Sequence, residues 1–340
     1  MKISFRHGWA MLSAAVLSLT ALPLSAVSSV TSLSAAAAAA PVVENLDRGI
    51  VAIKSGNGML VSWRFLASDP TGTEFRLYRD DQLLMTSKGD EATCFYDESG
   101  SASARYRVDS LVNGTVQTTS TCSLISGTDY FQIPMDVPTA SDCTYSPNDC
   151  SVGDVDGDGV YELFVKWDPS NSKDNSQKGK TGNVYIDCYK LTGEKLWRID
   201  MGKNIRAGAH YTQFLVADFD GDGYAEMTCK PADGTVDGTG KTIGDGSKDY
   251  RNSSGYILSG PEYYTLFDGR TGAALDTVNY VPDRGTVSKW GDKYGNRVDR
   301  FLGSVAYLDG VHPSAVTIRG YYTRTVSYTH LRAHETCADL

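Results

Sequence analysis

Residues 153–163 read GDVDGDGVYEL, and residues 217–227 read ADFDGDGYAEM. A short apolar run with strand character follows each copy, at residues 163–167 and 227–230. A second, weaker repeat of strand, Thr-Gly turn and strand occurs at residues 184–197 and 264–275. Strand-rich repeats cannot bury both of their faces alone, so they stack on their neighbours. The repeats therefore predict an all-β fold in which they form blades of a β-propeller.

The repeated acidic pattern has the oxygen donors of a calcium loop. Asp occupies positions 1, 3 and 5, Glu occupies position 9, and residue 7 adds a backbone carbonyl. Carboxylates this close repel one another unless a cation neutralises them, and an oxygen-only donor set suits Ca²⁺. Position 12 is Val165 or Cys229, which excludes an EF-hand. The predicted ligands are Asp154, Asp156, Asp158, Val160 and Glu162 in the first loop and Asp218, Asp220, Asp222, Tyr224 and Glu226 in the second.

A third acidic stretch, DGTVDG at residues 233–238, allows two interpretations. Asp233 and Asp237 either close another ion site or belong to a solvated, glycine-rich loop. Both interpretations fit the sequence.

The charge balance argues against nucleic acid as a partner. The 340 residues include 32 Lys and Arg against 41 Asp and Glu, for a formal charge of −9. A nucleic-acid binder needs clustered basic surface instead. The 7 Cys are too sparse for a disulfide scaffold. Cys143 and Cys150 are close enough in sequence to pair, but no connectivity is predicted.

Two segments precede the repeats. Residues 1–40 combine a short basic start, an apolar run and small residues, which is the order of a secretory signal peptide. We therefore expect a secreted protein that has no membrane segment once the signal is removed. Residues 42–126 contain short alternating runs around Trp63 and an Asn113-Gly114 turn. These features predict a β-sandwich similar to the fibronectin type III domains.

Four longer motifs carry a family resemblance. They are KWDPSNSKDNSQ at residues 166–177, RAGAHYTQF at 206–214, DYRNSSGY at 249–256 and RGYYTR at 319–324. Together they resemble the rhamnogalacturonan lyases of polysaccharide lyase family 11. The resemblance covers roughly residues 42–326 and implies a sandwich followed by an eight-bladed, calcium-binding propeller. It also implies that the partner is rhamnogalacturonan I, whose rhamnose–galacturonate bond is cleaved by β-elimination.

The resemblance also implies roles for individual residues. Asn148 and Asp168 correspond to sugar-contacting positions, and Asp149 corresponds to an additional calcium ligand. β-Elimination needs a base for the C5 proton and positive charge beside the galacturonate carboxylate. The candidates for this chemistry are His210, Tyr211, Lys166 and Arg206. None is assigned as the base, because a histidine on a strand is more often a buried, hydrogen-bonded residue.

The chain departs from the family pattern in two ways. Residues 130–326 provide only about three blades, and residues 327–340 do not continue the propeller pattern. We interpret 327–340 as a non-native tail and expect the chain as written to be a monomer without lyase activity.

Two other functions fit parts of the sequence. A non-catalytic calcium-binding propeller that binds glycan or protein would use the same acidic loops. A glycoside hydrolase is less well supported, because no acid and base pair separates from the metal carboxylates. The polar and basic runs 166–177 and 206–214 favour the lyase over both.

Overall fold

The computed structural model describes residues 41–322 and 325–330. The predicted signal peptide and the last ten residues lie outside this part. The described residues form β-strands and one 3₁₀ turn, η1 (Val287–Trp290), which confirms the all-β prediction. No helix among them has the length and apolar character to cross a membrane.

Residues 51–126 form two four-stranded sheets, with strand orders β5-β2-β1-β8 and β4-β3-β6-β7. All neighbouring strands are antiparallel except β1 and β8, which are parallel. The strands are β1 (Val51–Ser55), β2 (Gly58–Ser62), β3 (Glu74–Arg79), β4 (Gln82–Lys88), β5 (Cys94–Asp97), β6 (Tyr106–Val112), β7 (Thr115–Thr121) and β8 (Leu124–Ser126).

Local sequence explains these hairpins. In β3 half-buried and fully buried residues alternate at first, the period of a strand with one face in a core. The predicted turn at Asn113 and Gly114 is confirmed, because both residues have positive φ and the flanking Val112 pairs with Thr115. Positive φ at both central positions is what a two-residue type I′ hairpin requires. Trp63 packs edge-on against Phe75 in the core, with ring centroids 6.0 Å apart.

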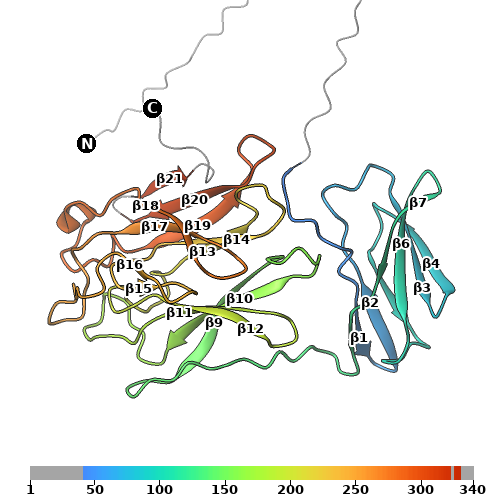
Figure 1. The fold of residues 1–340 in the computed structure, drawn as a ribbon, viewed down its shortest axis with the longest axis horizontal. Helices are drawn as coiled ribbons and strands as arrows, with labels where there is room; N and C mark the ends of the chain where they lie inside the picture. The colour runs from blue at the N-terminus through green and yellow to red at the C-terminus, as the bar shows by residue number, and fades with distance from the viewer. Residues whose placement is uncertain (1–40, 323–324, 331–340) are drawn as a thin grey trace, which may run out of the picture. The chain divides into compact units, whose positions relative to one another are not determined.

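Residues 145–330 form three further sheets that follow one another along the chain (Figure 1). Their strand orders are β16-β15-β12-β11-β10-β9, β13-β14-β17-β18 and β19-β20-β21. The strands are β9 (Tyr145–Gly153), β10 (Glu162–Pro169), β11 (Tyr185–Tyr189), β12 (Lys195–Asp200), β13 (Phe214–Ala217), β14 (Glu226–Cys229), β15 (Thr235–Val236), β16 (Thr242–Ile243), β17 (Tyr263–Phe267), β18 (Ala274–Asn279), β19 (Phe301–Ala306), β20 (Ser314–Arg319) and β21 (Val326–His330).

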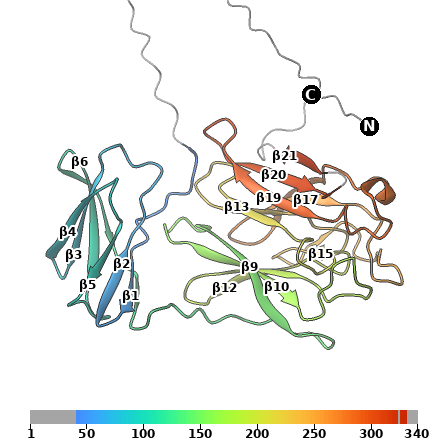
Figure 2. The same cartoon turned by 180° about the vertical axis from the view of Figure 1, so that it is seen from behind.

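The first strand of each sheet packs against the first strand of the next. β9 contacts β13, and β13 contacts β19, so the three sheets stand side by side as separate units (Figure 2). None of the described sheets closes into a barrel. In the first two sheets, the hairpin between the first and second strands contains the acidic pattern. The sequence repeat is therefore a repeat of hairpins.

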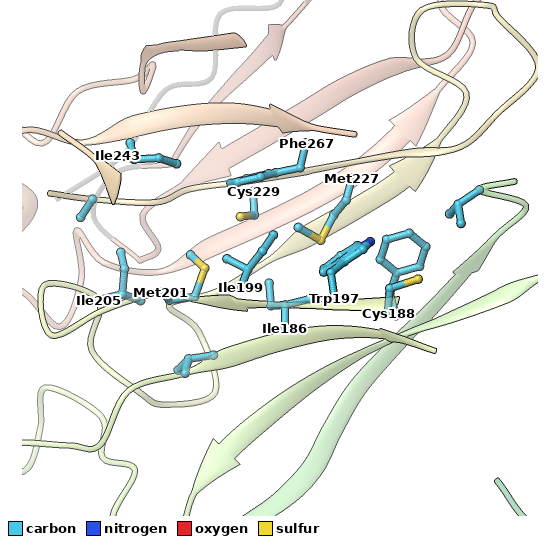
Figure 3. Packing of buried hydrophobic residues seen from close by; sticks show 14 of the residues in the cluster. Ile186, Cys188, Trp197, Ile199, Met201, Ile205, Met227, Cys229, Ile243 and Phe267 are labelled. Atoms are coloured by element: carbon cyan, nitrogen blue, oxygen red, sulfur yellow. The ribbon is translucent and has the colours of Figure 1, made fainter. Parts of the chain in front are cut away.

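The core between the first two sheets holds these units together. Figure 3 shows Ile186, Cys188 and Trp197 facing Met227 and Phe267 across this core. The indole Nε1 of Trp197 donates a hydrogen bond of 2.7 Å to the backbone carbonyl of Gly269. A second buried cluster, comprising Phe219, Tyr264, Tyr280, Phe301 and Ala315, joins the second and third sheets.

The six cysteines in the described part of the chain are free thiols. Cys188 and Cys229 are fully buried in the core, as ordinary apolar residues would be. The predicted non-native tail begins within β21, whose residues 326–330 pair with β20. Residues 331–340 lie outside the described part.

Truncating Trp197 will test the core between the first two sheets. We expect Trp197→Ala to lower the free energy of unfolding by about 3–5 kcal/mol, because it leaves a cavity and removes the bond to Gly269. Leu275→Ala is the matched control, since Leu275 on β18 is 54% exposed and its loss falls within about 0.5 kcal/mol. Urea unfolding measures both, and equal effects would contradict this assignment of the core.

Candidate functional site

Two groups of carboxylates lie at the acidic hairpins. Asp154, Asp156 and Glu162 each provide an oxygen within 4.8 Å of the others. The second group, Asp218, Asp220 and Glu226, has the same arrangement. In both groups the first Asp and the Glu are buried, although they are carboxylates. The structure thus brings together three of the predicted ligands in each loop.

Backbone hydrogen bonds shape the first loop. Gly157 and Gly159 have φ values of 77° and 84°, which favour glycine. Their amides donate to the two oxygens of Asp154 at 2.7 and 2.8 Å. Glu162 accepts from the amide of Val155 at 2.9 Å. The pattern DxDxDG thus folds the chain around its own first carboxylate.

The second loop repeats these bonds. Asp218 accepts from the amides of Gly221 and Gly223 at 2.7 and 3.0 Å. Glu226 accepts from the amide of Phe219 at 2.8 Å. In the corresponding hairpin of the third sheet, between β19 and β20, the carboxylate of Asp309 instead accepts a 2.8 Å hydrogen bond from Nδ1 of His312.

Burial makes the carboxylates costly to ionise without a counter-charge. Burial, reinforced by the neighbouring Asp residues, raises the pKa of Glu162 to about 7 and that of Glu226 to about 8. Burial also raises the pKa of Asp154 and Asp218, against the effect of the glycine amides. A bound divalent cation would reverse these shifts. The hard oxygen donors fit such a cation, so the residues present suit a metal site.

Several predicted ligands lie apart from these groups. The carboxylates of Asp158 and Asp222 accept from the backbone amides of Val160 and Tyr224. Asp149 forms an ion pair with Lys166 instead of joining the first loop. The predictions that Val160 and Tyr224 contribute carbonyls, and that Asp149 binds calcium, stay predictions.

The surroundings of the third acidic stretch, residues 233–238, differ from those of the two acidic hairpins. Asp233 accepts bonds of 2.8 and 2.9 Å from the hydroxyls of Tyr250 and Tyr263. Asp237 accepts from the amides of Thr239 and Lys241, both at 2.9 Å. Neither carboxylate belongs to a three-residue acidic group among the described residues. Their oxygens are occupied by protein donors that stabilise the loop.

Glu44 joins the loops from outside the repeat. Burial, followed by the charges of Asp218 and Asp154, raises its pKa, so its carboxylate lies within reach of both loops. The same segment contacts the first loop through the amide of Asp47, which donates to the Gly159 carbonyl at 3.2 Å. Sequence reasoning missed Glu44, because nothing in its neighbourhood marks it as acidic-loop sequence.

The predicted sugar-contacting residues meet at the β9–β10 pair. Asn148 on β9 donates to Asp168 on β10 at 2.9 Å. The other oxygen of Asp168 is buried without a hydrogen-bond partner, and burial raises the pKa of this residue despite the opposing charge of Lys166. The pair of Lys166 and Asp149 lies on the same two strands. These four residues, which the sequence analysis assigned to three different roles, therefore form one polar group on β9 and β10, called here the β9–β10 group.

His210 has the electrostatics of a neutral imidazole. Burial and the charges of Arg300 and Lys166 lower its pKa, against the weaker effect of Asp174. It therefore keeps a free nitrogen lone pair near neutral pH, as a general base requires. The effect of Lys166 also shows that His210 lies within electrostatic range of the β9–β10 group.

Tyr211 and Arg206 occupy structural positions. The Tyr211 hydroxyl is buried and accepts from the amide of Asn175 at 2.6 Å, and burial raises its pKa. Arg206 donates to backbone carbonyls of Lys173, Asp174, Gln177, Gly179 and Gly255. These hydrogen bonds hold both side chains in fixed positions. Their predicted part in catalysis is not tested by a bound sugar.

Two family models match the chain over these elements. "Rhamnogalacturonan lyase family 11, C-terminal domain" matches residues 130–335, and "Rhamnogalacturonan I lyases beta-sheet domain" matches residues 41–124. The fold and the site together define an all-β protein of paired sheets with repeated acidic hairpins. The chain belongs to rhamnogalacturonan lyase family 11.

Characterised proteins are similar over the same region. Rhamnogalacturonan endolyase YesW of Bacillus subtilis is 56% identical over 294 residues, covering 85% of this chain and 47% of that protein. Rhamnogalacturonan exolyase YesX of the same organism is 52% identical, covering 84% of this chain and 47% of that protein. The chain therefore spans about half the length of the curated relatives it matches.

Solved structures agree in fold. The crystal structure of YesW gives a TM-score of 0.77 at 55% identity, covering 86% of this chain and 51% of that one. A Bacillus licheniformis rhamnogalacturonan lyase gives 0.76 at 54% identity, covering 88% of this chain and 52% of that one.

The pH dependence of stability will reveal whether a cation fills the acidic loops. Without metal, Glu162 and Glu226 hold a proton up to about pH 7 and 8, whereas an unfolded chain releases it near about pH 4.3. The native state then binds more protons between these values, so the melting temperature in chelator falls as pH rises from about 5 to about 8. Added Ca²⁺ binds the ionised carboxylates and removes this fall. Circular dichroism melts at several pH values give the comparison, and parallel curves with and without Ca²⁺ would count against a metal site.

Removing one carboxylate from the loop tests whether Ca²⁺ binds at this site or is attracted only by the negative charge of the protein. We expect Asp154→Asn to weaken Ca²⁺ binding by at least about tenfold, because it withdraws a charged ligand from the loop. Asp276→Asn is the control, since Asp276 is an exposed carboxylate on β18. Isothermal titration with Ca²⁺ measures both, and equal affinity in the two variants would contradict the assignment.

Proposed function

We propose that the chain acts in rhamnogalacturonan I lysis, and that the β9–β10 group holds the saccharide. The observation that carries this proposal is the 2.9 Å contact of Asn148 with Asp168, beside Lys166 and Asp149, in a chain of this family. The amide and the two carboxylates offer donors and acceptors for sugar hydroxyls. Lys166 is buried and pairs with Asp149, so it offsets one of the two carboxylate charges of the group.

The proposed architecture is a calcium-binding propeller preceded by a fibronectin type III-like sandwich. Support comes from the contacts of β9 with β13 and of β13 with β19, since adjacent innermost strands are what radial blades present. The two packed four-stranded sheets of residues 51–126 support the sandwich. On this interpretation the described part contains three consecutive blades.

Calcium is the proposed ion of the acidic loops. Asp154, Asp156 and Glu162 would hold one ion, and Asp218, Asp220 and Glu226 another. A bound Ca²⁺ supplies positive charge that neutralises the carboxylates. The protein residues fix each hairpin through the glycine amides, which places β9 and β13 at their observed spacing. The proposed role of these two ions is therefore structural.

The elimination step needs a proton acceptor and a cation near one sugar. The base removes the proton from C5 of galacturonate, the electron pair of that bond forms the C4–C5 double bond, and the C4–O bond breaks. The departing oxygen takes up a proton from solvent water, and the protonated base returns its own proton to solvent. His210 is the candidate acceptor, because its lowered pKa keeps it neutral. Arg300, whose side chain is 19% exposed and whose charge acts on His210, is the candidate cation that offsets the carboxylate as charge develops, and the buried Lys166 contributes at longer range.

We further propose that the protein is secreted. The basic start, apolar run and small residues within residues 1–40 support export. An extracellular site also suits a polymeric substrate that does not enter cells.

Binding and cleavage will be tested separately. We expect the 340-residue chain to bind rhamnogalacturonan I in affinity electrophoresis, and Asp168→Asn to weaken that binding at least about fivefold through loss of a charged hydrogen bond. Asp276→Asn should bind as the unaltered chain does. No retardation of any variant by the polysaccharide would overturn the proposed saccharide group.

A chimera tests the chemistry. Residues 41–322 would replace the matching half of YesW, and ultraviolet absorbance of the unsaturated product would report cleavage. We expect activity that His210→Ala reduces at least about a hundredfold. Binding without any absorbance rise would favour the alternative, a non-catalytic glycan-binding module.

A further inference from the structure

Five charged side chains meet away from the β9–β10 group, between the second and third sheets. They come from the end of β14, the start of β17, the β18–β19 connection and the end of β20. No side chain in this charge cluster is more than 11% exposed. The members are Lys230, Glu262, Arg284, Asp299 and Arg319.

The charges of the cluster do not balance. The carboxylate of Glu262 forms ion pairs with three basic side chains. The N–O distances are 3.2 Å to Lys230, 2.9 Å to Arg284 and 2.7 Å to Arg319. Asp299 forms an ion pair with Arg319 at 3.2 Å. Three basic side chains thus face two carboxylates, so one positive charge is in excess when all five are ionised, and burial lowers the pKa of Lys230. An isolated buried charge is strongly unfavourable unless it is paired.

A small cavity opens onto this excess charge. Its volume is about 20 Å³, and Lys230, Arg284 and Asp299 line it together with Arg206 and Tyr211. Arg206 adds a third basic side chain to the lining, and its guanidinium donates to neutral backbone carbonyls. A cavity of this size holds one water molecule or one ion of similar radius.

Arg284 supplies an unused donor at the cavity. Its residue is 8% exposed, and its Nε has no hydrogen-bond partner in the described part of the chain. An oxygen of Asp299 lies 3.9 Å from this Nε, too far for a hydrogen bond. A guanidinium cannot lose its proton to relieve this situation.

We propose that the cavity binds a small monovalent anion, for which chloride is the physiological candidate. Water would satisfy the Nε donor but would leave the positive charge uncompensated. The enclosed space has room for about one water-sized particle. The anion stabilises the junction of the second and third sheets, because the residues that surround it come from both. This inference is independent of the proposed lyase function.

Thermal unfolding of the 340-residue chain tests the proposal. The melts use sodium chloride or sodium gluconate at one ionic strength, with Ca²⁺ supplied as gluconate. We expect the melting temperature to rise with chloride and to saturate, since at ten times the dissociation constant the folded-to-unfolded ratio gains about elevenfold. Bromide should give the same saturating rise, and gluconate none.

Two variants separate specific binding from salt effects. Arg284→Met removes the unused donor and should abolish the difference between chloride and gluconate. Arg270→Met is the matched control, because Arg270 is 53% exposed in its side chain and pairs with Asp268 away from the cavity; it should keep the full difference. An equal chloride effect in both variants would overturn the proposal.

A direct measurement covers the case in which Arg284→Met does not fold. Crystals of the unaltered chain grown in bromide should show an anomalous peak bounded by Lys230 and Arg284. Absence of that peak, or a melting temperature that is the same in chloride and gluconate, would show that the cavity holds water only.

Discussion

Repulsion among carboxylates buried beneath two hairpins constrains the larger part of this molecule. Asp154 and Glu162 on one hairpin, and Asp218 and Glu226 on the next, are held together by backbone amides of the loops. Those amides offset part of the free-energy cost of burying the carboxylates. The raised pKa values of Glu162 and Glu226 show that a proton or a cation must offset the rest. β9 and β13 are the first strands of these hairpins and pack together. The electrostatics of the loops therefore affects how the two sheets are placed.

Both copies of the repeat have a lysine at the same position, and the two lysines have different surroundings. Lys166 and Lys230 each follow the apolar run of the second strand in their sheets. The side chain of Lys166 is buried and pairs with Asp149, whose carboxylate is 55% exposed. Lys230 faces Glu262, which is 7% exposed, and belongs to a closed cluster with two arginines. Equal positions in the repeat therefore have different partners: one lysine pairs with an exposed carboxylate and the other with a buried one.

The local parts of the fold and site were predictable, and the long-range parts were not. The Asn113-Gly114 hairpin and the acidic loops depend on residues within about ten positions, so their patterns are visible in one sequence. The approach of Glu44 to both loops depends on tertiary packing, and no pattern near Glu44 announces it. Arg206 was a candidate for catalysis on residue type, and its guanidinium donates to carbonyls from two segments, residues 173–179 and Gly255. Asp233 and Asp237 were ambiguous because acidity alone does not show whether protein donors or an ion will meet a carboxylate.

Arg206 has a consequence for motion. One planar group binds the carbonyls of residues 173, 174, 177, 179 and 255, so these loops share a single anchor. A lysine has three donors on a flexible stem and cannot reproduce five fixed directions, which makes even a charge-preserving exchange disruptive there. Segments tied to one anchor open together, so amide protons across residues 173–179 and around Gly255 should exchange with solvent at a common rate, as one cooperative unit.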